Sequence, residues 1–472
     1  MPATTASAVR SASDLASRQD VSRLFARVAF GATAADLDTW EGQPYEAAVD
    51  HLLNVPALDS RAPAPDEAER IAYENAEVRD HDGNFFDIVY IYNFSTGIPE
   101  APAWWLERMR TTQYPLEERM VLFWHDHFAT AYLTPYPDGR MLILQNQMMR
   151  RHALGNFRDL VSAMTLDPAM LYWLNGNENA KGAPNENYAR ELFELFTLGV
   201  VPQVYTEQDI RESARALTGW VVNPDLKRVT FDANRHDTGS KTVLGETFGN
   251  LGAQEYLKVI DIALAQDVAS RFLAWKLVLN FAYVPDTGDL YQDPDPLVDE
   301  VAATLRSGWD LKAAMRTLLL SDGFRSADPS RQIVRQPIDL VVSACKAFGI
   351  GAKAQNVLLL LSRMGQLPFD PPNVGGWPIN KEWLSPVTTL ARYDWGVTCY
   401  NLWQSTLTGV RPALPPSGDL NQWARRFGLA DLSANTRALV QDYLAARAGA
   451  PESEKQAGVL ILLASSPDWM VT

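Results

Sequence analysis

The sequence predicts a mainly α fold, namely one large helical globular domain with a single small β-hairpin-like excursion. Hydrophobic residues make up 47% of the 472 residues, which is enough for a large buried core. Along most of the chain the apolar residues recur at the three- and four-residue spacing of helices. The segment Gly219–Phe248 departs from that spacing, since it combines β-branched residues, turn residues and short alternations. These three observations together indicate a helical body with one local β segment.

The N-terminal part of the chain begins with a polar stretch, residues 1–18, which we expect to be a disordered tail. Helical spacing starts at Val21 and is interrupted by a glycine. Residues 54–69 are rich in proline, alanine and acidic residues, so they predict a surface connection. From Ala103 to Val200 the spacing is again mostly helical.

In the C-terminal part, helical patterning resumes near Ala253 and continues to about Ser321. The segment 367–386, read as LPFDPPNVGGWPINKEWLSP, must be largely irregular because proline and glycine are frequent in it. No linker is long enough to separate two independently moving halves. We therefore predict one helical domain over residues 19–410, and a helical extension over 411–472 that packs on the same domain.

The overall composition excludes several classes of function. Asp and Glu number 57 against 42 Lys and Arg, and the formal charge of −15 would repel nucleic acid and anionic membranes. There is no run of 18 apolar residues that would predict a membrane span, and no apolar run typical of a secretory signal. A cytoplasmic location is therefore expected. With two cysteines, a disulfide framework and a cysteine-rich metal site are excluded. The sequence does not indicate an oligomeric state.

Six stretches occur in an order that carries a family resemblance. They are FWHDHFAT (123–130), RRHALGNFRDLVSAMTLDPAMLYWLN (150–175), KGAPNENYARELFELFTLG (181–199), YTEQDIRESARALTGW (205–220), HDTGSKTVLG (236–245) and PPNVGGW (371–377). Together they resemble the bacterial DUF1800 family, a domain of unknown function, from about Val21 to the C-terminus. The resemblance implies a fold family and a set of positions, but no settled reaction. Members often carry an export signal, and many have a histidine where this chain has Phe196.

The FWHDHFAT stretch places two histidines and an aspartate inside an apolar segment. If residues 116–131 form a helix, His125 and His127 point about 160° apart. They would share one metal ion only if the helix ended near Trp124. As core residues, both histidines would need hydrogen-bond partners. As functional residues, they would act as general base or metal ligands, with Asp126 orienting or coordinating.

A second histidine–aspartate pair, His236 and Asp237, lies in a turn-rich segment. It is typical of a capped turn, in which the aspartate bonds the backbone. If His236 instead lay near His125 and His127, the three imidazoles would suit iron, zinc or manganese.

The loop Asn175–Glu186 has the one, three, five and twelve ligand spacing of an EF-hand, through Asn175, Asn177, Asn179 and Glu186. This spacing raises the prospect of a calcium site. Ala180 replaces the required glycine, however, and Pro184 is unusual at its position. The alternative is a polar loop whose side-chain amides satisfy its own backbone.

The segment that follows is an amphipathic helix with Arg190, Glu191 and Glu194 on its polar stripe. On a solvated face, Arg190 and Glu194 would form an ordinary i,i+4 pair. In a cleft, Arg190 would bind an anionic substrate and Glu191 would act as acid, base or metal ligand.

Three classes of function follow from these candidates. The leading hypothesis is a metal-dependent enzyme, oxidative or hydrolytic, that acts on a small molecule or polymer. Its metal ligands would be His125, His127 and His236, and its catalytic residues His125, Asp126, His127, Arg190, Glu191 and Asp237. The second is a metal-free enzyme of glycoside-hydrolase type, in which Glu191 and Asp126 or Asp237 lie about 5–9 Å apart. The third is a non-catalytic binding or scaffold protein.

Overall fold

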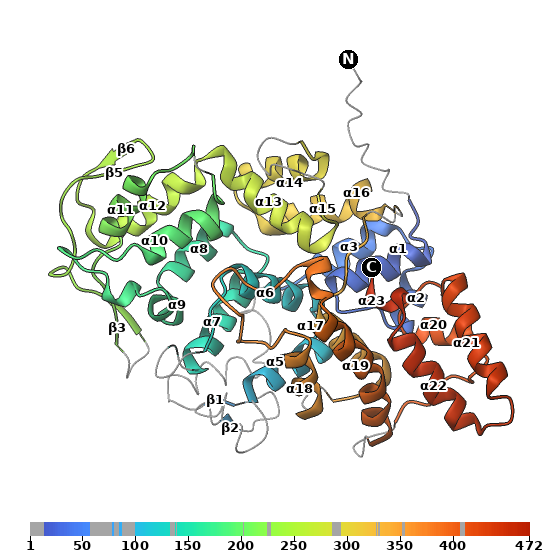
Figure 1. Cartoon of the computed structure of the whole chain (residues 1–472). Helices are drawn as coiled ribbons and strands as arrows, with labels where there is room; N and C mark the ends of the chain where they lie inside the picture. The colour runs from blue at the N-terminus through green and yellow to red at the C-terminus, as the bar shows by residue number, and fades with distance from the viewer. Residues whose placement is uncertain are drawn as a thin grey trace.

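The computed structural model describes residues 14–56, 78–79, 85–86, 100–132, 137, 139–201, 203–223, 228–285, 294–326, 328, 331–351, 355–405 and 411–472. Its helices form one continuous body (Figure 1), and the mainly α prediction is confirmed. Most of the tail predicted for residues 1–18 lies outside the described residues. Within it, Ser17 caps the first helix, where its side chain accepts a hydrogen bond from the Asp20 backbone N–H.

The first half of the chain is built from short and medium helices. They are α1 (Arg18–Val28), α2 (Ala34–Trp40), α3 (Tyr45–Leu53), α5 (Glu100–Thr111), α6 (Pro115–His127), α7 (Gly139–His152), α8 (Phe157–Thr165), α9 (Pro168–Trp173), the 3-10 helix η3 (Gly176–Glu178), α10 (Asn187–Glu191), the π-helix η4 (Leu192–Thr197) and α11 (Glu207–Ala216).

The second half continues in the same way. Its helices are η5 (Gly252–Gln254), α12 (Glu255–Leu264), α13 (Asp267–Phe281), α14 (Pro296–Arg306), α15 (Leu311–Leu320), α16 (Asp322–Arg325), α17 (Pro337–Phe348), α18 (Gln355–Arg363), η7 (Asn380–Trp383), α19 (Pro386–Ser405), α20 (Leu420–Arg426), α21 (Ala434–Ala446), α22 (Glu452–Ala464) and α23 (Pro467–Met470).

The β excursion predicted over Gly219–Phe248 is confirmed, and it comprises two antiparallel hairpins. Strand β3 (Trp220–Asn223) pairs with β4 (Arg228–Phe231), and β5 (Lys241–Val243) pairs with β6 (Glu246–Phe248). The second hairpin turns through Leu244 and Gly245, both with positive φ, which is the geometry of a tight two-residue hairpin turn. A further short pair joins β1 (Val78–Arg79) to β2 (Phe85–Phe86).

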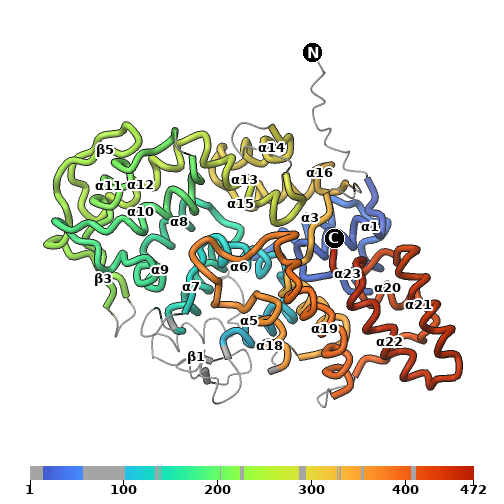
Figure 2. The backbone as a smooth tube through the Cα atoms, viewed as in Figure 1, coloured from blue at the N-terminus to red at the C-terminus, as the bar shows by residue number. Residues whose placement is uncertain are grey.

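Helix α6 lies in the middle of the body (Figure 2) and contacts α1, α3, α5 and α7. Proline at its first position and Glu117 and Glu118 in its first turn favour its start. From Leu116 to His127, every residue except Asp126 is buried, as expected for a helix that is apolar on both sides. The helix ends at His127, earlier than the predicted Ala131, because Phe128 leaves the helical conformation.

The C-terminal helices α20 to α23 pack against the rest of the body. Helix α22 lies on α19, where Gly396 allows close approach, since a Cβ there would lie 3.1 Å from the Ile461 carbonyl oxygen. The final residues form an antiparallel bridge between Val334 and Val471. Across the described residues, no helix combines the length and apolar character needed to cross a bilayer.

Candidate functional site

The end of α6 holds the irregular segment 367–386 through two side chains. His125 Nε2 accepts a hydrogen bond from the Phe369 backbone N–H at 3.0 Å. Asp126 Oδ1 accepts one from the Trp377 backbone N–H at 2.7 Å. His125 is also surrounded by the rings of Trp105, Phe369 and Trp377, and burial lowers its pKa to about 3. His125 is therefore a neutral hydrogen-bond acceptor in the core.

The fit between Asp126 and the segment 367–386 depends on a glycine. Gly376 has φ +88°, and a Cβ at that position would lie 2.3 Å from Asp126 Oδ1. The carboxyl therefore occupies the space that a side chain would need. Burial raises the pKa of Asp126 to about 6, although the Trp377 N–H and the charges of Lys276 and Arg119 oppose that rise.

His127 faces a different part of the core, as expected for a residue two positions along a helix. Its Nε2 lies 3.1 Å from the carbonyl oxygen of Phe196, so Nε2 carries the proton and donates. Its Nδ1 is buried and has no hydrogen-bond partner among the described residues. Phe196 lies in the π-helix η4, a kind of irregularity that often accompanies functional sites.

His236 lies in a third place, beside the second hairpin. Its Nδ1 is 2.9 Å from the Thr218 carbonyl oxygen, and its Nε2 is 3.2 Å from Glu255 Oε1. The other Glu255 oxygen is 2.6 Å from Lys241 Nζ, and all three side chains are buried. The result is a buried charge network that ties the hairpin to α12.

The neighbouring Asp237 turns away from this network. Its carboxylate accepts two hydrogen bonds from Arg215, at 2.9 and 3.1 Å, and one from the Gly239 backbone N–H at 2.8 Å. These bonds, led by the one from Arg215, lower the pKa of Asp237 to about 2. Asp237 is an ionised, paired carboxylate that stabilises a turn.

Arg190 and Glu191 lie on α10 with different environments. Arg190 makes two hydrogen bonds to Glu207, at 2.8 and 2.7 Å, and these raise its pKa. Glu191 is half-buried, and burial together with the charge of Glu194 raises its pKa. Arg190 is thus occupied by carboxylates of this chain rather than free to bind a substrate.

The loop with EF-hand spacing uses its asparagines to support backbone and neighbouring side chains. Asn177 Oδ1 accepts from the Val222 N–H at 2.7 Å, and Asn179 Oδ1 accepts from the Asn185 N–H at 2.9 Å. Asn175 Oδ1 accepts from the Asn187 side chain at 3.0 Å. The Asn179 bond lies within the loop, whereas Asn177 holds β3 and Asn175 holds a side chain of α10.

The structure therefore brings His125 and Asp126 to one place and leaves the other predicted site residues elsewhere. His127, His236 and Arg190 each have separate partners, and the three histidines do not share a site. Within the described ranges, no group of three or more His, Cys, Asp or Glu side chains is arranged to hold a metal ion.

A family model described as "Protein of unknown function (DUF1800)" matches residues 23–471. The chain belongs to this family. No curated protein and no solved structure matches it. In this DUF1800 protein, the FWHDHFAT and PPNVGGW stretches meet directly, since Asp126 and Trp377 are hydrogen-bonded 251 residues apart in the sequence.

A crevice of about 40 Å³ lies beside Asp126, and sequence reasoning missed most of the residues that line it. They include Arg27, Arg119 and Arg335, which come from α1, α6 and the strand-like segment before α17. Arg27 lies among the apolar residues that α1 buries. The sequence signal that could have found this site is an arginine within an apolar helical stripe. Such an arginine is expected to be buried, and a buried guanidinium requires hydrogen-bond or charge partners.

Proposed function

We propose that this DUF1800 protein is an enzyme in which the Asp126 carboxyl transfers a proton to or from a substrate bound at the crevice. The observation that carries the proposal is the placement of this half-buried carboxyl. One of its oxygens is fixed by the Trp377 N–H, its pKa is about 6, and it lines the crevice with three arginines.

The chemistry suited to this arrangement is hydrolytic. A carboxyl with a pKa near 6 is present in both protonation states near neutral pH, so it can serve as acid or base. The Trp377 N–H bonds Oδ1 of Asp126, and Oδ2 would interact with a water molecule or substrate. The crevice has room for a water molecule. The guanidinium groups of Arg119 and Arg335 would stabilise negative charge that develops on a substrate oxygen.

The metal-dependent enzyme stays a prediction. The feature that favours it is Nδ1 of His127, a buried nitrogen with no hydrogen-bond partner among the described residues, on a ring whose other nitrogen donates to a carbonyl, as metal-bound histidines do. Its test is the metal content of untagged protein, measured by mass spectrometry alongside His127→Ala. One metal ion per chain, lost in the variant, would support it.

The acid–base proposal is tested by screening the protein against nitrophenyl esters, phosphoesters and glycosides. We expect activity on one of these classes, and Asp126→Asn should lower it at least a hundredfold. The activity of the wild-type protein should change with pH around 6. Asp261→Asn is the matched control, because Asp261 pairs with Arg158 at the surface, 2.5 Å away. Full activity in Asp126→Asn with the best substrate would refute the proposal.

A further inference from the structure

Four buried arginines form a cluster near the N-terminal helix. Arg27, Arg119, Arg335 and Arg392 are 3%, 3%, 4% and 0% exposed. Arg119 Nε bonds the Arg27 carbonyl oxygen at 3.2 Å, and Arg392 bonds the Arg335 carbonyl oxygen at 3.0 Å. These bonds link the four arginines in two pairs, and Arg335 is close enough to Arg119 and Arg392 for their charges to interact. We call the four side chains the arginine cluster.

The arginine cluster carries more positive charge than its neighbours neutralise. Among the described residues it has one ion pair, from Arg119 Nε to Asp339 Oδ1 at 3.6 Å. Arg27 donates to the Arg331 carbonyl oxygen at 3.1 Å and to a carboxyl oxygen of Thr472, the last residue of the sequence, at 2.8 Å. Asp339 and this carboxyl group together offset only part of the charge of the four arginines.

Arg335 donates to the carbonyl oxygens of Trp469 and Asp339, at 3.3 and 3.0 Å. In the described part of the chain, the Nε atoms of Arg27, Arg335 and Arg392 have no partner, nor does Nη1 of Arg392. Buried charge without a counter-charge is costly. Burial, the largest cause, lowers the pKa of Arg27 to about 9 and that of Arg335 to about 10.

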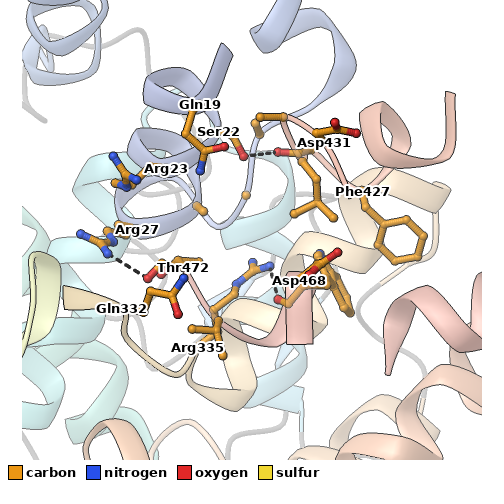
Figure 3. Close-up of a pocket in the computed structure, with 18 of the residues that line it drawn as sticks. Gln19, Ser22, Arg23, Arg27, Gln332, Arg335, Phe427, Asp431, Asp468 and Thr472 are labelled. Carbon is orange, nitrogen blue, oxygen red and sulfur yellow. Dashed lines mark hydrogen bonds between the residues drawn. The ribbon is translucent and has the colours of Figure 1, made fainter. Parts of the chain in front are cut away.

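A cavity of about 310 Å³ opens onto two members of the arginine cluster. Figure 3 shows Arg27 and Arg335 reaching it from separate segments, with Ser22, Gln19 and Gln332 nearby. Its volume lies within the range of small-molecule sites. Three acidic residues line the cavity, namely Asp328, Asp431 and Asp468. Asp431 pairs with Arg437, and Asp468 accepts from the Ser433 N–H at 2.7 Å.

We propose that this cavity binds a small molecule through an anionic phosphate or carboxylate group, which contacts Arg27 and Arg335. Such a group would add counter-charge to an arginine cluster that Asp339 only partly neutralises, and planar guanidiniums suit the paired oxygens of both groups. The inference does not rest on acid–base chemistry at Asp126, because binding can be measured without turnover. The chain as a whole has a net charge of −15 and repels anions. The buried guanidinium groups at this cavity would attract an anion in spite of that net charge.

The test is titration calorimetry of the full chain with inorganic phosphate and, separately, with succinate. Saturable binding of either probe is expected, and the preferred probe identifies the group. Arg27→Gln should weaken binding at least tenfold, whereas Arg158→Gln, at a surface pair with Asp261, should leave it within twofold. The two proposals fail in different ways, because the acid–base proposal fails on unchanged turnover in Asp126→Asn, whereas this one fails on absent binding of both probes to the wild-type chain.

A second variant covers the case in which Arg27→Gln does not fold. Gln332 is exposed at the cavity, so Gln332→Glu adds a negative charge there without disturbing the buried arginines. It should weaken binding several-fold, and the effect should shrink in high salt. The proposal is overturned if neither probe binds saturably at concentrations up to about 10 mM, which covers weak metabolite affinities. Equal binding by Gln332→Glu and wild type would overturn it as well.

Discussion

His125 Nε2 accepts a hydrogen bond from the backbone N–H of Phe369, 3.0 Å away and 244 residues later in the chain. The carbonyl oxygen of Phe369 accepts in turn from the Tyr132 N–H at 3.2 Å. Phe369 has a φ of +66°, a conformation that is unfavourable for a bulky residue. The two hydrogen bonds therefore hold a strained residue in place, and α6 fixes the course of the segment 367–386.

His125→Leu should destabilise the protein by about 1–3 kcal/mol, because it removes the acceptor for a buried backbone N–H. The measurement is urea unfolding followed by tryptophan fluorescence. His51→Leu, at an exposed position on α3, is the control and should change stability by less than about 0.5 kcal/mol. Equal effects of the two substitutions would show that the His125–Phe369 bond contributes no stability.

The polar residues His125, Asp126 and His127 lie in an apolar segment because each one forms a hydrogen bond with buried, irregular backbone elsewhere in the chain. His125 bonds Phe369, Asp126 bonds Trp377, and His127 bonds Phe196. Buried backbone that is not in regular α-helix or sheet needs side-chain partners. The helical period correctly indicated that the two histidines face opposite ways. It could not indicate their partners, because contacts between residues so far apart in sequence leave no local pattern.

Other parts of the site were predictable to different degrees. In the asparagine loop, the bond from the Asn185 N–H to Asn179 follows local side-chain to backbone rules, whereas the bond from the Val222 N–H to Asn177 spans 45 residues. The excess positive charge around Arg335 was not predictable, since the arginine cluster is assembled from α1, α6, α19 and the segment before α17. The sequence indicated the β segment but not its division into two hairpins, because Leu244–Gly245 is not among the common turn pairs.

Stability at acid pH should improve when His127 is replaced by phenylalanine. Burial lowers the pKa of His127 well below 6.5, so below pH 6.5 the unfolded chain gains a proton that the folded chain does not. Stability is then lost as pH falls, at up to about 1.4 kcal/mol per pH unit. His127→Phe removes this loss, so its stability relative to wild type should rise by about 2 kcal/mol between pH 6.5 and 5.

The control for this pH effect is Phe123→Leu, a buried substitution on the same helix that changes no titrating group. Its effect on the urea midpoint should be similar at pH 7.5 and pH 5. If His127→Phe shows the same pH-independent behaviour, then His127 is not the neutral, buried imidazole described above.

Gly376→Ala should disrupt the packing of the Asp126 carboxyl group against the backbone of residue 376. The added Cβ would lie 2.3 Å from Asp126 Oδ1, at a residue with φ +88°. Gly42→Ala is a matched control, since its φ is +76° but nothing lies within 4 Å of the added Cβ. Gly42→Ala should therefore report the backbone cost alone, about 1 kcal/mol. Gly376→Ala should cost clearly more in urea unfolding, and similar losses in both variants would contradict the close fit.

Glu255→Gln should be among the most destabilising single changes in the chain, because it leaves Lys241 buried without its counter-charge. Lys241 Nζ lies 2.6 Å from Glu255 Oε2 with both side chains at 0% exposure, and breaking such a pair costs about 3–5 kcal/mol. The surface pair Lys258–Glu246 has the same 2.6 Å separation at 34% and 51% exposure, so Glu246→Gln should cost less than about 1 kcal/mol. Adding Lys241→Met to Glu255→Gln should recover part of the loss in a double-mutant cycle, since no unpaired ammonium remains. If the double variant were less stable than Glu255→Gln alone, the lysine would be held by the Asp237 carbonyl, to which it also donates, rather than by the glutamate.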